Sequence, residues 1–188
     1  MESSAELKER FEQYVVKDGD LENRVNIVMH SCRKTVTQEM KKDEDFGELF
    51  QEYHFSGSYY DKLAVGDIRH EFDLNVVFGV PEGSYQIRRP SSNDDQSECN
   101  FMEFVVTDCP DDTINLIAEK GRISAGKMKE VLKTALDRAL TRLKNRVVSE
   151  SGEGVRVTRT EGLALTLKLQ PDSGFVPSIE VDLVPVLR

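Results

Sequence analysis

A short segment in which acidic and apolar residues alternate constrains this chain more than any other. Glu71 and Asp73 alternate with apolar positions, which are Phe72, Leu74, Val76 and Phe78. Successive side chains of a strand point to opposite faces, so the pattern predicts a strand with one buried face and both carboxylates on the other. Neighbouring like charges repel, and a divalent cation compensates them, because Mg²⁺ prefers carboxylate oxygens and keeps phosphates among its ligands.

Two other parts of the chain would complete a site for handling phosphates. Residues 178–184 form a second alternating strand, in which Glu180 and Asp182 share the face opposite Ile179, Val181 and Leu183. A third carboxylate from such a strand would allow two metal ions about 3.5–4 Å apart, as in two-metal phosphoryl transfer. Earlier in the chain, Gly57 lets the backbone approach a phosphate, and Ser58 adds a hydroxyl donor.

These motifs resemble a known family. Gly57-Ser58, two acids separated by one residue, and one acid on a later strand form the pattern of the polymerase-β-like nucleotidyltransferases. Gly57-Ser58-Tyr59-Tyr60 followed by Glu71-Phe72-Asp73 is similar to cyclic GMP–AMP synthase (cGAS) and the cGAS-like receptors. The likeness covers most of residues 20–188 and extends to three further stretches: a helix at 122–128, the segment 179–182, and the helix leading up to Gly57.

The resemblance implies an α+β fold, with a twisted mixed β-sheet flanked by long helices, that forms the N-terminal lobe of a bilobal enzyme. Residues 1–56 would hold N-terminal helices, including a long spine-type helix, and residues 57–188 the nucleotidyltransferase catalytic core. The C-terminal helical lobe of the family would be absent from this chain. Base choice and linkage of the product would depend on that lobe, and activity without it stays open.

The resemblance also implies a chemistry and roles for single residues. Glu71, Asp73 and Asp182 would be the catalytic residues and the ligands of two Mg²⁺ or Mn²⁺ ions, and Gly57 and Ser58 would bind the nucleotide. The substrates would be ATP and GTP, and the product a cyclic dinucleotide such as cyclic GMP–AMP. Synthesis would follow the sensing of double-stranded RNA or DNA in innate immunity and antiviral defence.

Basic residues provide two candidate surfaces for a polyanion. In the family the long helix before the Gly-Ser motif carries part of the nucleic-acid surface, which implies that role for Arg33, Lys34, Lys41 and Lys42. The alternative is an ordinary solvated helix face. Between Lys120 and Arg146 nine basic residues oppose only two acids, although the whole chain carries a formal net charge of −9. That net charge argues against generic nucleic-acid binding and requires one specific face instead.

Composition and periodicity complete the predictions. The 188 residues suffice for one domain, and no apolar run approaches the roughly 20 residues of a membrane span. Cys32, Cys99 and Cys109 are an odd set that favours free thiols and a cytoplasmic location, with the nucleus as the alternative. Periodicity predicts helices and strands over the following ranges: helices at 3–16, 21–40 and 125–148, a helical turn at 111–113, and strands at 71–80, 101–107, 155–160, 163–169 and 179–187.

Two alternative functions stay open. One is a template-independent enzyme of the same superfamily that makes linear products, such as an oligoadenylate synthase. The other is a non-catalytic relative that binds a nucleotide or a partner protein as a scaffold. Three acids at Glu71, Asp73 and Asp182 count against the scaffold, which has no need of them.

Overall fold

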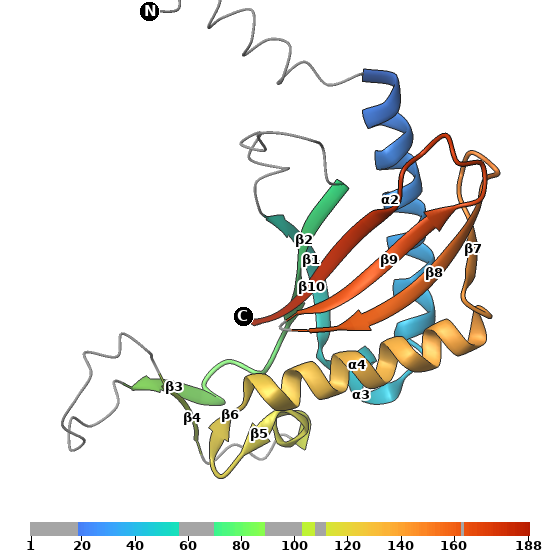
Figure 1. The fold of residues 1–188 in the computed structure, drawn as a ribbon. Coiled ribbons are helices and arrows are strands. Elements are labelled where there is room, and N and C mark those ends of the chain that lie inside the picture. Colours follow the sequence, from blue (N-terminus) through green and yellow to red (C-terminus); the bar gives the residue numbers. More distant parts are fainter. Residues whose placement is uncertain (1–18, 57–69, 89–102, 108–111, 163) are drawn as a thin grey trace, which may run out of the picture.

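A mixed β-sheet covered by helices on one face forms the centre of the structure, a computed structural model that describes residues 19–56, 70–88, 103–107, 112–162 and 164–188 (Figure 1). The strand order is β1-β2-β10-β9-β8-β7. The six strands have the following bounds: β1 Phe50–Ser56, β2 His70–Phe78, β7 Arg146–Val148, β8 Gly154–Glu161, β9 Leu165–Pro171 and β10 Ile179–Leu187. The β2 and β10 strands are parallel and the other neighbours antiparallel, so the predicted α+β class with a mixed sheet is confirmed.

Helix α2, Gly19–Met40, lies across one face of this sheet. Helix α4, Ala125–Arg142, packs against α2 and shares the same hydrophobic core with the sheet. The strands turn their apolar alternation toward these helices, as Phe72, Leu74 and Val181 illustrate at 1–3% exposure. All the apolar residues predicted for the inner faces of β2 and β10 are buried. The opposite face of the sheet therefore receives the polar half of each strand.

The hydrophobic core also contains one of the three cysteines, Cys32. Cys32 on α2 is a free, buried thiol, and burial raises its pKa to about 12. Cys99 and Cys109, the predicted helix at 3–16, and Gly57 and Ser58 lie outside the described residues. Within the described part of the chain, no helix has both the length and the apolar composition needed to cross a bilayer.

A second, smaller sheet lies beyond one end of the first, next to the start of α4 (Figure 1). It has the order β3-β4-β6-β5, with the bounds β3 Tyr85–Arg88, β4 Glu103–Val106, β5 Ala118–Glu119 and β6 Arg122–Ile123. A 3₁₀ helix, η1, covers Asp112–Leu116 at the predicted helical turn. The stretch 122–128 expected as a helix begins as strand β6, and Ser124 caps α4 by accepting a hydrogen bond from the Lys127 amide.

The second long helix is shorter than predicted. The second long helix ends at Arg142 instead of residue 148, because Lys144 and Asn145 adopt positive φ and residues 146–148 join the sheet as β7. The long helix expected before Gly57 is α2, and the segment between α2 and Gly57 had no predicted element. It contains the short helix α3, Glu44–Leu49, followed by strand β1, whose Tyr53 and Phe55 face α2.

The end of β10 accommodates a proline, Pro185. Pairing with β9 stops at Leu183, whereas pairing with β2 continues to Leu187. Pro185 lacks a backbone N–H and lies where β10 has a ladder partner on one side only. The division into residues 1–56 and 57–188 stays a prediction, although α2 and β1 share one hydrophobic core with the later strands.

Asp43 joins α3 to α4 and provides a test of this packing. Its Oδ1 accepts a hydrogen bond from the Phe46 amide at the start of α3, at 3.3 Å, and its Oδ2 pairs with the Arg138 guanidinium on α4. The Asp43 side chain is 2% exposed. We expect Asp43→Ala to lower the free energy of unfolding by about 2 kcal/mol, because a helix cap and a buried charge partner are lost together.

Urea denaturation of the full chain measures this change. Asp43→Asn should cost less, since the amide oxygen still caps α3. Glu48→Ala, an exposed change on the same helix, should alter the free energy of unfolding by less than about 0.5 kcal/mol. Equal effects of Asp43→Ala and Glu48→Ala would contradict a structural role for Asp43.

Candidate active site

The predicted acids meet through the parallel register of β2 and β10. Asp182 pairs with Asp73, and Glu180 pairs with Glu71. Paired residues of neighbouring strands project to the same face, so all four carboxylates lie on the face opposite α2. Asp73 and Asp182 are partly buried, while Glu71 is exposed. The register thus places the three predicted acids and Glu180 on one face of the sheet, with Asp73 beside Asp182 and Glu71 beside Glu180.

A line of polar side chains crosses the sheet at Asp73 and Asp182. We call it the first row, and from β8 to β1 it consists of Thr160, Thr166, Asp182, Asp73 and Ser56. The Thr166 hydroxyl donates to Asp182 Oδ1 at 2.5 Å. Sequence reasoning missed Thr166, although a lone threonine between the buried Leu165 and Leu167 marks a polar-face position.

A second row lies beside the first, toward the start of β10, and consists of Thr158, Lys168, Glu180 and Glu71. Lys168 Nζ lies 3.2 Å from Glu180 Oε1. Glu180 therefore has a cationic partner, whereas Asp182 accepts a hydrogen bond from a neutral hydroxyl. The same alternation that predicted Asp182 also placed Glu180 on this face, but nothing in the sequence separates their roles.

The electrostatics of the first row favour a cation. At the spacing of neighbouring strands, about 4.8 Å, two carboxylates repel by roughly 3 kcal/mol for an effective dielectric constant of about 20. Among the described residues, no three acidic, histidine or cysteine side chains gather closely enough to hold an ion by themselves. Asp73 and Asp182 provide two hard oxygen donors side by side, and Mg²⁺ commonly takes one or two carboxylates together with substrate phosphates. The residues present therefore fit Mg²⁺ or Mn²⁺ shared with a triphosphate.

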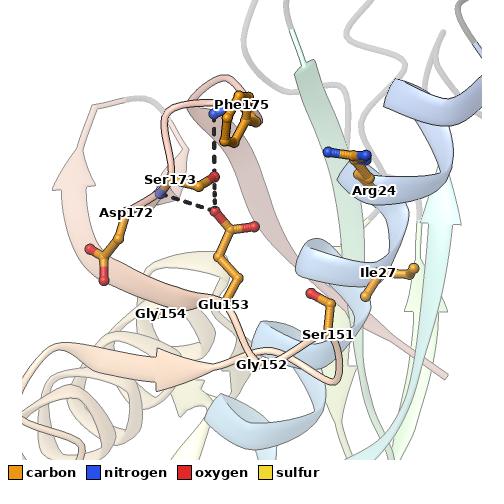
Figure 2. Close-up of a pocket in the computed structure, with 9 residues that line it drawn as sticks. All are labelled: Arg24, Ile27, Ser151, Gly152, Glu153, Gly154, Asp172, Ser173 and Phe175. Carbon is orange, nitrogen blue, oxygen red and sulfur yellow. Dashed lines mark hydrogen bonds between the residues drawn. The ribbon is translucent and has the colours of Figure 1, made fainter.

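A separate open pocket of about 530 Å³ lies between α2, the β7–β8 turn and the β9–β10 connection (Figure 2). Glu153 Oε1 accepts hydrogen bonds from the Ser173 amide, at 3.2 Å, and from the Ser173 hydroxyl, which ties the two loops together. Phe175 stands at the pocket rim and is 77% exposed. The acids of the two rows are not among the residues that line this pocket.

The four basic residues predicted near α2 have different surroundings. The Arg33 guanidinium lies over the rings of Tyr53 and Phe55, 5.8 and 5.2 Å from their centroids, and is partly buried. Lys34 pairs with Glu150 at 3.6 Å and is 65% exposed. Lys41 lies 4.5 Å from the centre of the Phe50 ring, and Lys42 pairs with Glu39 at 2.6 Å. Arg33 is thus part of the packing between α2 and β1.

The basic run from Lys120 to Arg146 is largely compensated within the fold. Acids from other segments pair with most of it, in the following pairs: Arg122–Glu103, Lys133–Glu161, Arg138–Asp43, Arg142–Glu39 and Arg146–Asp172. Lys127 pairs with Glu130 within α4. The basic residues of this run therefore connect α4, β6 and β7 to neighbouring segments.

The different surroundings of Arg33 and Lys34 lead to a test. We expect Arg33→Ala to lower the free energy of unfolding by about 1 kcal/mol, because the guanidinium loses its contacts with two aromatic rings. Lys34→Ala, next in the chain and paired only at the surface, should change it by less than about 0.5 kcal/mol. Urea denaturation compares the two, and equal losses would argue against a packing role for Arg33.

Comparison with known families agrees with this geometry. The family model described as "Mab-21 protein nucleotidyltransferase domain" matches residues 59–188. The match covers well over half of the chain and includes all four acids of the two rows. No curated protein matched the chain. The match begins two residues after Gly57 and continues to Arg188. The chain therefore belongs to the Mab-21 family and carries its nucleotidyltransferase domain, which supports a transferase activity.

Proposed function

We propose that this protein is a cGAS-like receptor, which joins ATP and GTP into a cyclic dinucleotide such as cyclic GMP–AMP when it binds double-stranded RNA or DNA. It would act in the cytoplasm, or alternatively in the nucleus, in innate antiviral defence. Membership of the Mab-21 family supports nucleotidyl transfer. The resemblance of Gly57-Ser58 and Glu71-Phe72-Asp73 to cGAS supports the cyclic product. The pairing of Asp73 with Asp182 carries the proposal, because it brings two carboxylates side by side on one face of the sheet, as the binding of a metal–triphosphate complex would require.

Each residue of the site would have a distinct task. Asp73 and Asp182 would hold the metal ions, and Glu71, two residues before Asp73 on the same face, would provide further carboxylate oxygens. When bound, two Mg²⁺ or Mn²⁺ ions would lower the pKa of the attacking hydroxyl and stabilise charge on the phosphates. The three carboxylates would hold the metal ions in place before the reaction begins. Such a preorganised site lowers the activation free energy of nucleotidyl transfer.

The transfer itself balances without another reactant. A ribose hydroxyl oxygen of one nucleotide forms a bond to the α-phosphorus of the other. The bond from that phosphorus to the oxygen bridging to the β-phosphate breaks, and pyrophosphate leaves with the electron pair. The hydroxyl proton passes to the Asp182 carboxylate. A second transfer between the joined nucleotides would close the ring.

Gly57 and Ser58 are proposed to bind the triphosphate. Ser56, the last residue of β1, pairs with Asp73 in the first row. Gly57 and Ser58 follow Ser56 directly in the sequence. A glycine allows close backbone approach to a phosphate, and a serine hydroxyl can donate to its oxygens.

The trigger would contact the basic residues at α2. Lys34 and Lys42 each pair with an acid at an exposed position, and Lys41 covers an aromatic ring. Such exposed ion pairs contribute little stability, so the phosphates of a duplex can replace the acids at little cost. Arg33 would contribute from the same surface. Binding of this kind weakens as salt increases.

The first test removes single carboxylates. Asp73→Asn and Asp182→Asn should each reduce product formation by at least about 100-fold, because a metal ligand and the proton acceptor are lost while side-chain size is kept. The assay incubates the full-length protein with ATP, GTP and Mn²⁺, with and without duplex RNA or DNA, and identifies products by mass. Asp172→Asn, an exposed change away from both rows, should leave the rate unchanged.

The outcomes of this assay separate the candidate functions. A cyclic dinucleotide that depends on a duplex supports the receptor. A linear oligonucleotide would instead identify an enzyme of the oligoadenylate synthase type. Normal turnover by Asp182→Asn would refute the site.

Ligand binding provides a test that does not require turnover. A non-hydrolysable ATP analogue with Mn²⁺ should raise the Tm of the protein. A hundredfold excess over Kd corresponds to about 2.7 kcal/mol of added stability. The analogue without metal should raise the Tm less, and Asp73→Asn should remove the difference between the two conditions. No shift under any condition would favour a non-catalytic scaffold.

A further inference from the structure

Strand β9 contributes one polar side chain to each acid on the open face of β10. Thr166 pairs in register with Asp182 and donates its hydroxyl proton to Oδ1, at 2.5 Å. Lys168 pairs in register with Glu180 and lies 3.2 Å from it. The two acids are two residues apart on one strand and face the same way, yet their partners differ in charge.

This difference has an electrostatic consequence. An ammonium group compensates most of the charge of its carboxylate partner and so weakens that carboxylate's attraction for a metal ion. A hydroxyl is neutral, so its hydrogen bond restrains and partly stabilises the carboxylate without cancelling its net negative charge. The bond from Thr166 occupies Oδ1 and leaves Oδ2 for another ligand. Hydrogen-bond partners of this type, one layer behind a metal ligand, orient it and raise its affinity for the metal.

We propose that Thr166 is a positioning residue for Asp182, and that β9 in this way selects Asp182 instead of Glu180 as the metal-binding acid of β10. The inference rests on the proposed function, because it assumes that the first row binds Mg²⁺ or Mn²⁺. Thr166 acts only through Asp182 and touches neither substrate nor metal. Its hydroxyl compensates part of the repulsion that Asp182 experiences from Asp73 and holds the carboxylate in one orientation until the ion arrives.

Mn²⁺ binding to the full chain, measured by the paramagnetic resonance signal of free Mn²⁺, tests this inference without requiring activity. Thr166→Val keeps the side-chain shape, removes the donor and should weaken Mn²⁺ binding by about 10-fold or more. Thr166→Ser restores the donor and should stay within about 3-fold of the wild type. Thr158→Val makes the same chemical change one strand further from Asp182, on the same face, and should leave the affinity unchanged.

Two further variants keep the result interpretable. Glu180→Gln should leave Mn²⁺ affinity within about 3-fold of the wild type, whereas Asp182→Asn should reduce it by more than about 10-fold. Thermal unfolding of every variant reports whether the fold is intact. Thr166→Ala serves in place of Thr166→Val if the latter does not fold. In the product assay, Thr166→Val should need more Mn²⁺ for half of its maximal rate, and Thr166→Ser should not.

The outcomes separate this inference from the proposed function. Wild-type affinity in both Thr166→Val and Thr166→Ala, with weakened binding by Asp182→Asn, would overturn the role of Thr166 and leave the proposed site standing. Equal affinity in the wild type and Asp182→Asn would overturn both. A stronger loss in Glu180→Gln than in Asp182→Asn would show that Glu180 is the ligand and that β9 makes the opposite selection.

Discussion

The parallel pairing of β2 with β10 is the interaction on which the rest of the structure depends. These strands are about a hundred residues apart in the chain, yet they pair along their whole length. Both faces of the pair are used. Phe72 and Leu74 pair with Val181 and Leu183 on the face buried by α2, and Asp73 pairs with Asp182 on the other. A slip of one residue would bury the acids, so the hydrophobic core itself maintains the register of the candidate site.

The same division between faces explains how an acidic chain can present a cluster of carboxylates and remain folded. Two acids at the contact between α4 and β8 have basic partners, in the pairs Arg159–Asp137 and Lys133–Glu161. The hydrogen bond to the Asp137 carboxylate raises the pKa of the Arg159 guanidinium. The hydrogen bond from Lys133 lowers the pKa of the Glu161 carboxyl. On the open face, Asp182 has a hydroxyl instead. Cations therefore compensate the acids between α4 and β8, whereas Asp182 on the open face is held by a neutral group.

Elements with a strong and uninterrupted period could be predicted from the sequence. Helix α2, the start of α4 at Ser124 and strand β10 occur close to their expected limits, because burial and capping agree with local preference there. The end of α4 could not be predicted, since the apolar pattern continues past Arg142 while Lys144 and Asn145 turn the chain. Strand β1 was also missed, because its bulge between Phe50 and Glu52 interrupts the alternation. For the candidate site, the sequence predicted that Glu71, Asp73 and Asp182 lie on polar strand faces, but not which residues of β9 contact the acids of β10.

The sequence by itself determined which residue types lie on which face of each strand, because alternation depends only on the two-residue period of the backbone. It therefore determined that Glu71 and Asp73 would share a polar face, and that Glu180 and Asp182 would do the same. Only the tertiary structure decided that β2 and β10 lie side by side with their acids on the same face, and that Asp73 pairs with Asp182. It also decided that Thr166 pairs with Asp182 and Lys168 with Glu180. Those relations depend on strand order and register, which are set by packing between segments far apart in the chain and leave no local signal.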